Sequence, residues 1–203
     1  MINVSNEFKT LMSERQDFKE YAEVTLANGT VLELTEDDFS IDNNSLVDSA
    51  GANSIPLGVA LSRNVQLEIM NDDDHLSDYD FFGAKIRLYL TFELSSTTEK
   101  IEYGTFTVTQ PETYGSVVTI VGYDDMYKAD KTYSTTLTFP ATAKSVLIDS
   151  CDTCGILIGD SNFLHNDFQI PTMPSSEYTH RQIIGFIAMI ACGNARIDRT
   201  GHL

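Results

Sequence analysis

The chain has 203 residues and a mass of 22.6 kDa, of which 42% are hydrophobic and 21% charged, a composition typical of folded globular chains and not of disordered, collagen-like or disulfide-dense ones. Its 30 acidic and 13 basic residues give a net charge of −17, the wrong sign for a surface that neutralises nucleic-acid phosphates or anionic lipid. The composition therefore predicts a folded protein without nucleic-acid or membrane-surface partners.

Export and membrane insertion are also not expected. The first residues contain no basic segment followed by an apolar run, which is the pattern of a secretion signal. The longest apolar stretch, residues 183–192, covers ten residues, whereas a membrane span needs about 20. Three cysteines are an odd number and do not indicate a disulfide framework. These features predict a chain made in a reducing cytoplasm.

The charges divide the chain unevenly. Residues 1–130 hold 24 acidic and 8 basic residues, and residues 131–203 hold 6 and 5. Strand patterns dominate the first part and helical patterns the second, which places a boundary near residues 130–137. The fold class expected is β plus α+β. It comprises an N-terminal helical arm (residues 1–20), an antiparallel β-barrel domain (residues 21–134) and a small α+β domain (residues 135–203).

The chain opens with an amphipathic pattern that predicts a helix over residues 5–19, with Ser5 as N-cap. Two alternating runs then flank Asn28-Gly29, a dipeptide that accepts positive φ at both turn positions. This pattern predicts a β-hairpin over residues 21–34.

Four further strands are predicted at residues 65–70, 85–94, 101–109 and 117–123. In the second of them Ile86, Leu88, Leu90 and Phe92 should face one way, as in a strand with one buried side. Several short strands with turn residues between them indicate an antiparallel barrel or sandwich.

The second part begins with a predicted strand at residues 136–139. A helix over residues 142–154 follows, ended by Gly155. Another helix is predicted at residues 179–193, where Thr179 and Gln182 form a capping-box pattern. Its nearly continuous apolarity makes it the central helix, with Phe186 in the core. Residues 195–203 are typical of a strand, a turn and the start of another strand, so we expect this domain to be truncated.

A run of carboxylates follows the strand at residues 65–70. Oxygen ligands of this kind suit a calcium ion, but the spacing lacks the glycine of an EF-hand loop, and such clusters ordinarily form turns. We therefore favour a turn, keep a bound divalent cation as an alternative, and give catalysis little weight. The candidate metal ligands are Asp72, Asp73, Asp74, Asp78 and Asp80.

The remaining chemical candidates also have ordinary structural interpretations. Cys151 and Cys154 form a CxxC pair without a second ligand pair, and they fall in the last helical turn. Buried core cysteines are therefore favoured over a redox or metal role. Tyr79, Phe81 and Phe82 could form a sugar-binding surface, but packing is favoured. No common hydrolase, metalloprotease or nucleotide-binding motif is present, so neither a catalytic residue nor a cofactor is predicted.

Four segments taken together resemble a known family. They read VQLEIMNDDD at residues 65–74, YDFFGAKIRL at 79–88, EYGTFTV at 102–108 and VTIVGYDDM at 118–126. They are similar to the N-terminal part of tail hub, or baseplate hub, proteins of bacteriophages and prophages, which are related to the hubs of contractile secretion machines. Residues 135–203 resemble the small α/β domain that follows the first barrel in such hubs.

The resemblance implies a structural role without catalysis in this segment. It implies a homotrimeric ring that joins the tail tube to the spike or tip, located in the virion tail after assembly in the bacterial cytoplasm. It also implies a longer protein, with a second barrel and in some members a peptidoglycan-cleaving domain downstream. The acidic first part would suit a channel lining that repels DNA.

Two other function classes remain open from sequence. The first alternative is a sugar- or calcium-binding β-module on the tail tip or cell surface. The second is a cell-wall hydrolase, which would need a pair of carboxylates for catalysis. With 30 acidic residues some pair at a suitable distance is expected by chance, so the presence of a pair is no evidence for this function.

Overall fold

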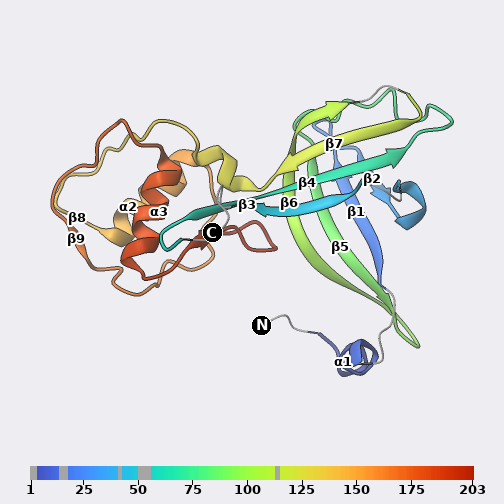
Figure 1. The fold of residues 1–203 in the computed structure, drawn as a ribbon, viewed down its shortest axis with the longest axis horizontal. Coiled ribbons are helices and arrows are strands. Elements are labelled where there is room, and N and C mark those ends of the chain that lie inside the picture. Colours follow the sequence, from blue (N-terminus) through green and yellow to red (C-terminus); the bar gives the residue numbers. More distant parts are fainter. Residues whose placement is uncertain (1–3, 14–17, 41–42, 50–55, 113–114) are drawn as a thin grey trace. The chain divides into compact units, whose positions relative to one another are not determined.

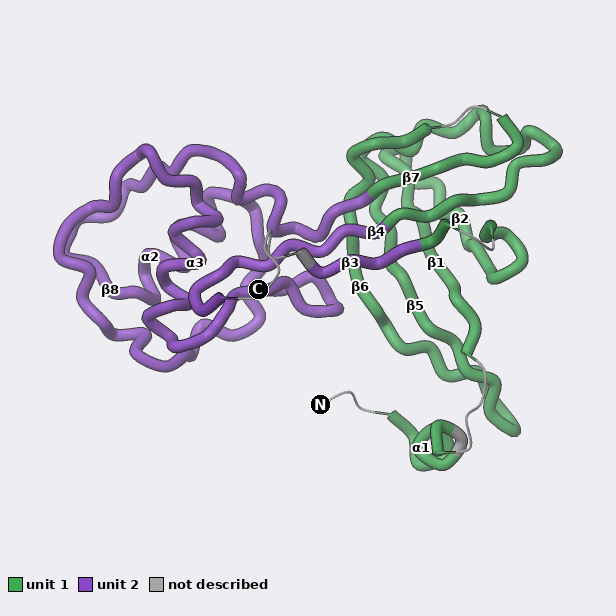
Figure 2. Tube along the Cα trace, in the orientation of Figure 1, with its two compact units in different colours: residues 1–44, 66–121 green, residues 45–65, 122–203 purple. Residues whose placement is uncertain are grey.

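The structure is a computed structural model, and it describes residues 4–13, 18–40, 43–49, 56–112 and 115–203. The chain divides into two compact units (Figure 1, Figure 2). Unit 1 contains Met1–Asn44 and Gln66–Val121, and unit 2 contains Ser45–Val65 and Gly122–Leu203. The chain therefore passes between the units three times. The domain boundaries expected after residues 20 and 134 stay predictions.

Unit 1 is built on an antiparallel sheet in which the strand order is β4-β7-β6-β5-β1-β2. The predicted hairpin is confirmed, because β1 and β2 pair antiparallel, but of the two expected turn positions only Gly29 has a positive φ (+87°) and Asn28 does not. Side chains on one face of the sheet form the core, among them Val24, Ile86, Phe106 and Ile120. The strands are β1 (Lys19–Thr25), β2 (Val31–Leu34), β4 (Ala60–Met70), β5 (Lys85–Glu93), β6 (Thr98–Glu112) and β7 (Val117–Tyr123), of which β4 and β7 each have residues in both units.

The sheet is not a closed barrel, so the barrel prediction was wrong, while the β-rich class with a few helices holds. β2 has only four residues, and a 3₁₀ turn, η1 (Glu36–Asp38), follows it directly. Asp38 holds this turn by accepting hydrogen bonds from the Thr35 backbone N–H (2.7 Å) and hydroxyl (2.9 Å). The chain then meets β4 through an isolated bridge between Phe39 and Ile69. A closed barrel would need a full strand paired with β4 at this position, and the chain forms a single bridge there.

The alternation predicted for β5 holds only in part. Ile86, Leu88 and Phe92 are buried, but Leu90 is half-buried and Tyr89 is buried as well. The register with β6 shifts between Leu88 and Tyr89, which is the signature of a β-bulge. Such an irregularity interrupts the two-residue period on which the prediction depended.

Helix α1 (Asn6–Ser13) confirms the predicted N-terminal helix in a shorter form. The chain is already in β1 at Lys19, and residues 14–17 lie outside the described part. Phe8 packs edge-on against Phe92 with ring centroids 4.6 Å apart. Glu7 accepts hydrogen bonds from the backbone N–H and hydroxyl of Ser95. These contacts attach the helix to the β5–β6 hairpin of unit 1.

Unit 2 is the α+β part of the molecule, and it contains both predicted helices, although the second ends at Ile190 and not at residue 193. Thr142 caps the first helix and Gly155, with a φ of +66°, ends it. Thr179 and Gln182 form the predicted capping box of the second. The elements of unit 2 are β3 (Ser45–Ser49), η2 (Asp125–Ala129), β8 (Ala141–Thr142), α2 (Ala143–Cys154), β9 (Gln169–Ile170), α3 (His180–Ile190) and β10 (Ala195–Arg196).

The segment at residues 56–61 completes unit 2. β10 pairs in parallel with β4 at Ala60 and Leu61. Gly58, with a φ of +81°, donates its N–H to the Gly193 carbonyl at 3.0 Å. A Cβ atom on Gly185 of α3 would lie 2.6 Å from the Gly58 carbonyl oxygen. Two glycines therefore let the backbone of this segment touch the helix.

Two expectations about unit 2 were wrong. Residues 136–139 form no strand; the Leu137 N–H bonds to the Thr135 hydroxyl instead of to a strand partner, and β8 begins after Pro140. Phe186 is not a core residue, because 42% of its surface is exposed. It lies on the outer side of α3 and packs edge-on against Tyr178, with ring centroids 5.2 Å apart.

This placement predicts opposite outcomes for two neighbouring substitutions. Ile184 is fully buried, so Ile184→Ala should lower the free energy of unfolding by about 2–5 kcal/mol. Phe186→Ala should cost about 1 kcal/mol, since it removes one exposed aromatic contact. Chemical denaturation of both variants measures the difference. A larger loss for Phe186→Ala than for Ile184→Ala would contradict this assignment of the core.

Candidate functional site

The aspartate run lies in consecutive turns after β4. Asn71, only 2% exposed, organises them: its side-chain oxygen accepts the Leu76 N–H at 2.8 Å, and its amide donates to the Gly115 carbonyl at 3.2 Å. Asp73 contacts His75, and Asp74 accepts a hydrogen bond from Ser77. Asp80 accepts the Phe82 N–H at 2.9 Å. The structure thus places Asp72, Asp73, Asp74, Asp78 and Asp80 in turns.

These carboxylates do not converge on one point. Within the described ranges, no group of three or more His, Cys, Asp or Glu side chains is arranged to hold a metal ion. Asp73, Asp74 and Asp80 each bond to a neighbour in the turn. This is the turn chemistry that the composition of the run favours.

The turns present one aromatic side chain to solvent. Phe81 is fully buried, whereas Phe82 is 63% exposed. The Gly83 N–H donates to the Val108 carbonyl at 2.9 Å, and the Ala84 N–H donates to the Phe81 carbonyl at 3.0 Å. The backbone around Phe82 is therefore fixed while its ring faces water. The packing role favoured for these aromatics applies to Phe81 and does not apply to Phe82.

The CxxC pair lies in the core of unit 2. Cys151 and Cys154 are both buried and free, and burial raises the pKa of the Cys151 thiol to about 12. A thiol with so high a pKa carries almost no thiolate at neutral pH, and the thiolate is the nucleophile and the metal ligand. Both side chains act as small apolar residues here.

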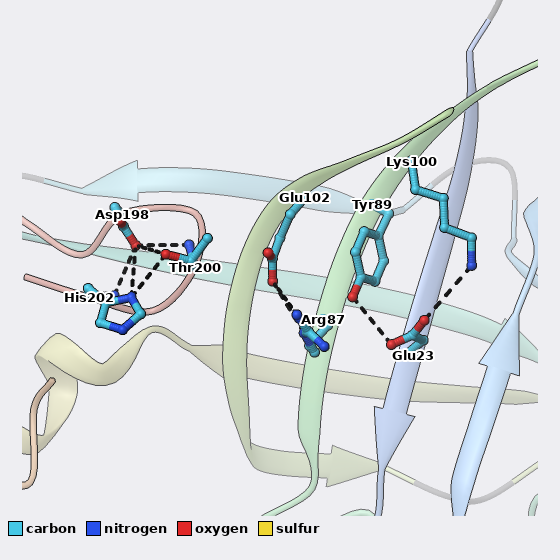
Figure 3. Close-up of polar contacts among 8 residues, drawn as sticks. All are labelled: Glu23, Arg87, Tyr89, Lys100, Glu102, Asp198, Thr200 and His202. Carbon is cyan, nitrogen blue, oxygen red and sulfur yellow. Dashed lines mark hydrogen bonds and ion pairs between the residues drawn. The ribbon is translucent and has the colours of Figure 1, made fainter. Parts of the chain in front are cut away.

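A face of the unit 1 sheet carries paired charges on β1, β5 and β6 (Figure 3). Arg87 donates from Nε and Nη2 to the same oxygen of Glu102, both at 3.2 Å. The Tyr89 hydroxyl donates to Glu23 at 3.3 Å, and Glu23 also pairs with Lys100 at 3.9 Å. Such exposed pairs contribute little to stability. The sequence does not reveal this face, because the register between strands decides which charged residues meet.

Burial raises the pKa values of the two tyrosines on this face, Tyr21 and Tyr89. Lys100 lies 3.7 Å from the centre of the Tyr21 ring, a cation–π contact. Burial raises the pKa of Tyr21 above its ordinary value, and the nearby Lys100 opposes that shift. Burial likewise raises the pKa of Tyr89, against the effect of Arg87. Both phenols are therefore neutral at physiological pH, and the Tyr89 hydroxyl donates to Glu23.

In unit 2, Asp198 closes the turn after β10 (Figure 3). One carboxylate oxygen accepts hydrogen bonds from the Thr200 N–H (2.8 Å), the Thr200 hydroxyl (2.9 Å) and the His202 N–H (2.9 Å). Burial alone would raise the pKa of Asp198, but these hydrogen bonds lower it below its ordinary value. Asp198, Thr200 and His202 therefore stabilise the turn, and the Thr200 hydroxyl donates its hydrogen bond to the carboxylate.

A buried carboxylate joins β4 to η2 in unit 2. Asp124 is 1% exposed and accepts hydrogen bonds from the Ser62 hydroxyl (3.0 Å), the Arg63 N–H (2.9 Å) and the Met126 N–H (3.2 Å). Burial raises the pKa of this carboxyl above its ordinary value, although the three hydrogen bonds counteract the effect. With its acceptor sites used by neighbouring donors, Asp124 has a structural role.

α3 begins with a buried histidine. His180 is fully buried, accepts the Ser134 N–H at Nε2 (3.3 Å) and lies edge-on to Tyr133. Its Nδ1 has no hydrogen-bond partner among the residues described. Burial lowers the pKa of His180, with Lys131 acting in the same direction and Asp149 opposing it. The ring is therefore neutral in the folded protein at neutral pH.

Unit 2 also contains an open pocket of about 210 Å³. Asn194 and Arg196 are its polar lining residues, and both are exposed. Arg196 is the one charged residue in the lining. The apolar lining comes from α2, α3 and the segments around them: Leu147, Phe163, Ile184, Ile187, Ala188, Ala191, Ala195 and Leu203.

Comparison with known proteins gives a likeness in fold. No protein-family model matches the sequence, and no curated protein matches it. The structure is similar to the crystal structure of the 43 kDa tail protein of prophage MuSo2 from Shewanella oneidensis. The TM-score is 0.53 and the identity 12%, over 92% of this chain and 53% of that chain. At that identity the likeness concerns the fold.

A chain from the virion of a native gene transfer agent particle was also found, with a TM-score of 0.41 and 13% identity over 68% of this chain and 50% of that chain. That score is too low to define a shared fold. The chain spans about half the length of these two proteins. In the described part of the chain, no helix is both long and apolar enough to cross a membrane.

The buried histidine predicts a pH dependence of stability. A histidine whose folded pKa lies below its ordinary value of 6.5 binds fewer protons when folded than when unfolded. The contribution of this histidine to the free energy of unfolding is fully present above pH 6.5, and it is lost as the pH falls through that value toward the folded pKa. Thermal or urea unfolding between pH 7.5 and 5 should show this loss, and His180→Gln should reduce it. The exposed His165 gives a matched control, His165→Asn, which should leave the slope unchanged; equal slopes for all three proteins would refute the prediction.

Proposed function

We propose that this chain is a non-catalytic structural component of a phage-like tail, acting in the hub that joins the tail tube to the spike or tip. The observation that carries the proposal is the likeness in fold to a prophage tail protein over 92% of this chain. The four segments that resemble the N-terminal part of tail hubs support the finer assignment. They lie on strands β4, β5, β6 and β7, on η2 and on the turns beside these elements.

The proposal includes the partners and location that the resemblance implies. The chain would form a homotrimer, contact tail tube and spike or tip proteins, and reside in the virion tail after assembly in the bacterial cytoplasm. Unit 1 has 20 acidic and 6 basic residues, and in an assembled ring such a charge would repel DNA from a lumen that it lined.

Antibody labelling of isolated particles tests the proposal. In electron micrographs of tail particles from the bacterium that encodes this chain, label should be confined to one end of the tail. Deletion of the gene should yield particles whose tubes lack a spike or tip, and expression of the intact chain should restore them. Label along the whole tail, or none on particles, would refute a hub role.

A further inference from the structure

We propose that the pocket of unit 2 binds Phe82 of a second copy of this chain, so that copies associate head to tail. The Phe82 loop is defined here as residues 71–84. This inference deepens the proposed function and rests on it for the expectation that several copies assemble.

Phe82 has the properties of an interface anchor. At 63% exposure it is the most exposed large hydrophobic side chain in the described part of the chain. The hydrogen bond from its N–H to Asp80 and the burial of Phe81 hold the loop in place without a partner. Because the backbone of the loop is already fixed, binding orders only the Phe82 side chain and costs little conformational freedom. Aromatic anchors of this kind tend to dominate the binding energy of interfaces.

The pocket has the size and lining for one such anchor. Pockets that hold drug-sized ligands start at roughly 300 Å³, and this one measures about 210 Å³. It is therefore better matched to a single side chain than to a metabolite. Its walls are aliphatic and aromatic, from Leu147, Phe163, Ile184 and Ile187 among others.

Charge favours the Phe82 loop as the partner. The Phe82 loop contains five aspartates and neither lysine nor arginine. The only charged side chain in the pocket lining is Arg196. Unit 1 has 20 acidic and 6 basic residues, whereas unit 2 has 10 and 7. Contact between unit 1 of one copy and unit 2 of another reduces the repulsion that two copies of unit 1 would experience, because the net charge of unit 2 is −3 and that of unit 1 is −14. The opposite charges of the acidic loop and Arg196 also favour one orientation of the partners.

The two surfaces differ, so the contact is heterologous. Each copy offers one loop and one pocket, and a heterologous contact makes a closed ring when its rotation closes and a filament when it does not. A closed ring of three copies would be the homotrimer of the proposed function.

The first test measures solution mass by light scattering over a concentration series. The wild-type chain should associate. Phe82→Ser should weaken association by about 30-fold or more, the effect of losing an anchor worth 2 kcal/mol, and Arg196→Glu should also weaken it. Phe168→Ser is the matched control: Phe168 is 51% exposed and lies outside the pocket lining. A monomeric wild-type chain, or equal association of wild type and Phe82→Ser, would overturn the inference.

The second test separates loss of a surface from loss of folding. Phe82→Ser retains an intact pocket, and Ala191→Phe fills the pocket but retains an intact loop. At a concentration at which the wild-type chain associates but a contact weakened about 30-fold does not form, each variant alone should be monomeric, whereas their mixture should form a 1:1 pair with twice the 22.6 kDa mass of one chain. A mixture that stays monomeric would overturn the inference, and circular dichroism confirms that both variants are folded. If Arg196→Glu, an exposed change, also leaves association intact, the pocket is not the docking site.

The outcomes distinguish the inference from the function on which it rests. Association that ignores Phe82 and Arg196, with label still at one tail end, would refute this interface and leave the hub role standing. Head-to-tail pairing in a chain that is absent from tail particles would support the interface and refute the hub role.

Discussion

Unit 2 is organised by a backbone contact between Gly58 and helix α3. A Cβ on Gly185 would lie 2.6 Å from the Gly58 carbonyl oxygen, and one on Gly58 would lie 2.8 Å from the Met189 side chain. Because neither residue has a side chain, the segment before β4 lies directly on the helix. It can then bond to Gly193 and, through the Val59 N–H, to Asn194 at 2.9 Å.

Other features of unit 2 follow from this contact. The Ala195 N–H reaches the Val59 carbonyl at 3.0 Å, which starts the pairing of β10 with β4. That pairing places Ala195 and Arg196 beside the inner residues of α3, where they line the pocket. A wider separation between α3 and this segment would move one wall of the pocket. The docking surface proposed for a second copy therefore depends on two glycines outside it.

Features set by neighbouring residues were predictable from sequence. The hairpin turn at Asn28-Gly29, the end of α2 at Gly155 and the Thr179–Gln182 capping box each involve residues within four positions of one another, and all three are present. Features set by distant residues were not. The apolar run of α3 does not reveal which side of the helix lacks a neighbour, so the sequence predicts a core position for Phe186 although the residue is exposed.

The same distinction applies to the candidate sites. The turns that contain the aspartates follow from local side-chain bonding, which the composition indicates. The exposure of Phe82 could not be read from its neighbours, because Phe81 beside it is fully buried. The pocket was not predictable either, because it is lined by residues of α2, α3 and β10 that are far apart in sequence.

The prediction of a closed barrel was wrong because β2 ends after four residues and η1 follows where further strand pairing would be needed. The number of strands does not indicate where the pairing between two of them ends.

The free energy of unfolding of Gly185→Ala tests the account most directly. Alanine in a helix is favoured over glycine by about 1 kcal/mol when space allows, so a loss of stability can come only from the close contact. The account predicts that Gly185→Ala is destabilised by about 1–3 kcal/mol, the usual cost of overpacking. Gly193→Ala is the control, since its nearest atom lies 4.0 Å away, and it should change stability little. A Gly185→Ala variant as stable as the wild type, or more stable, would contradict the contact on which unit 2 is built.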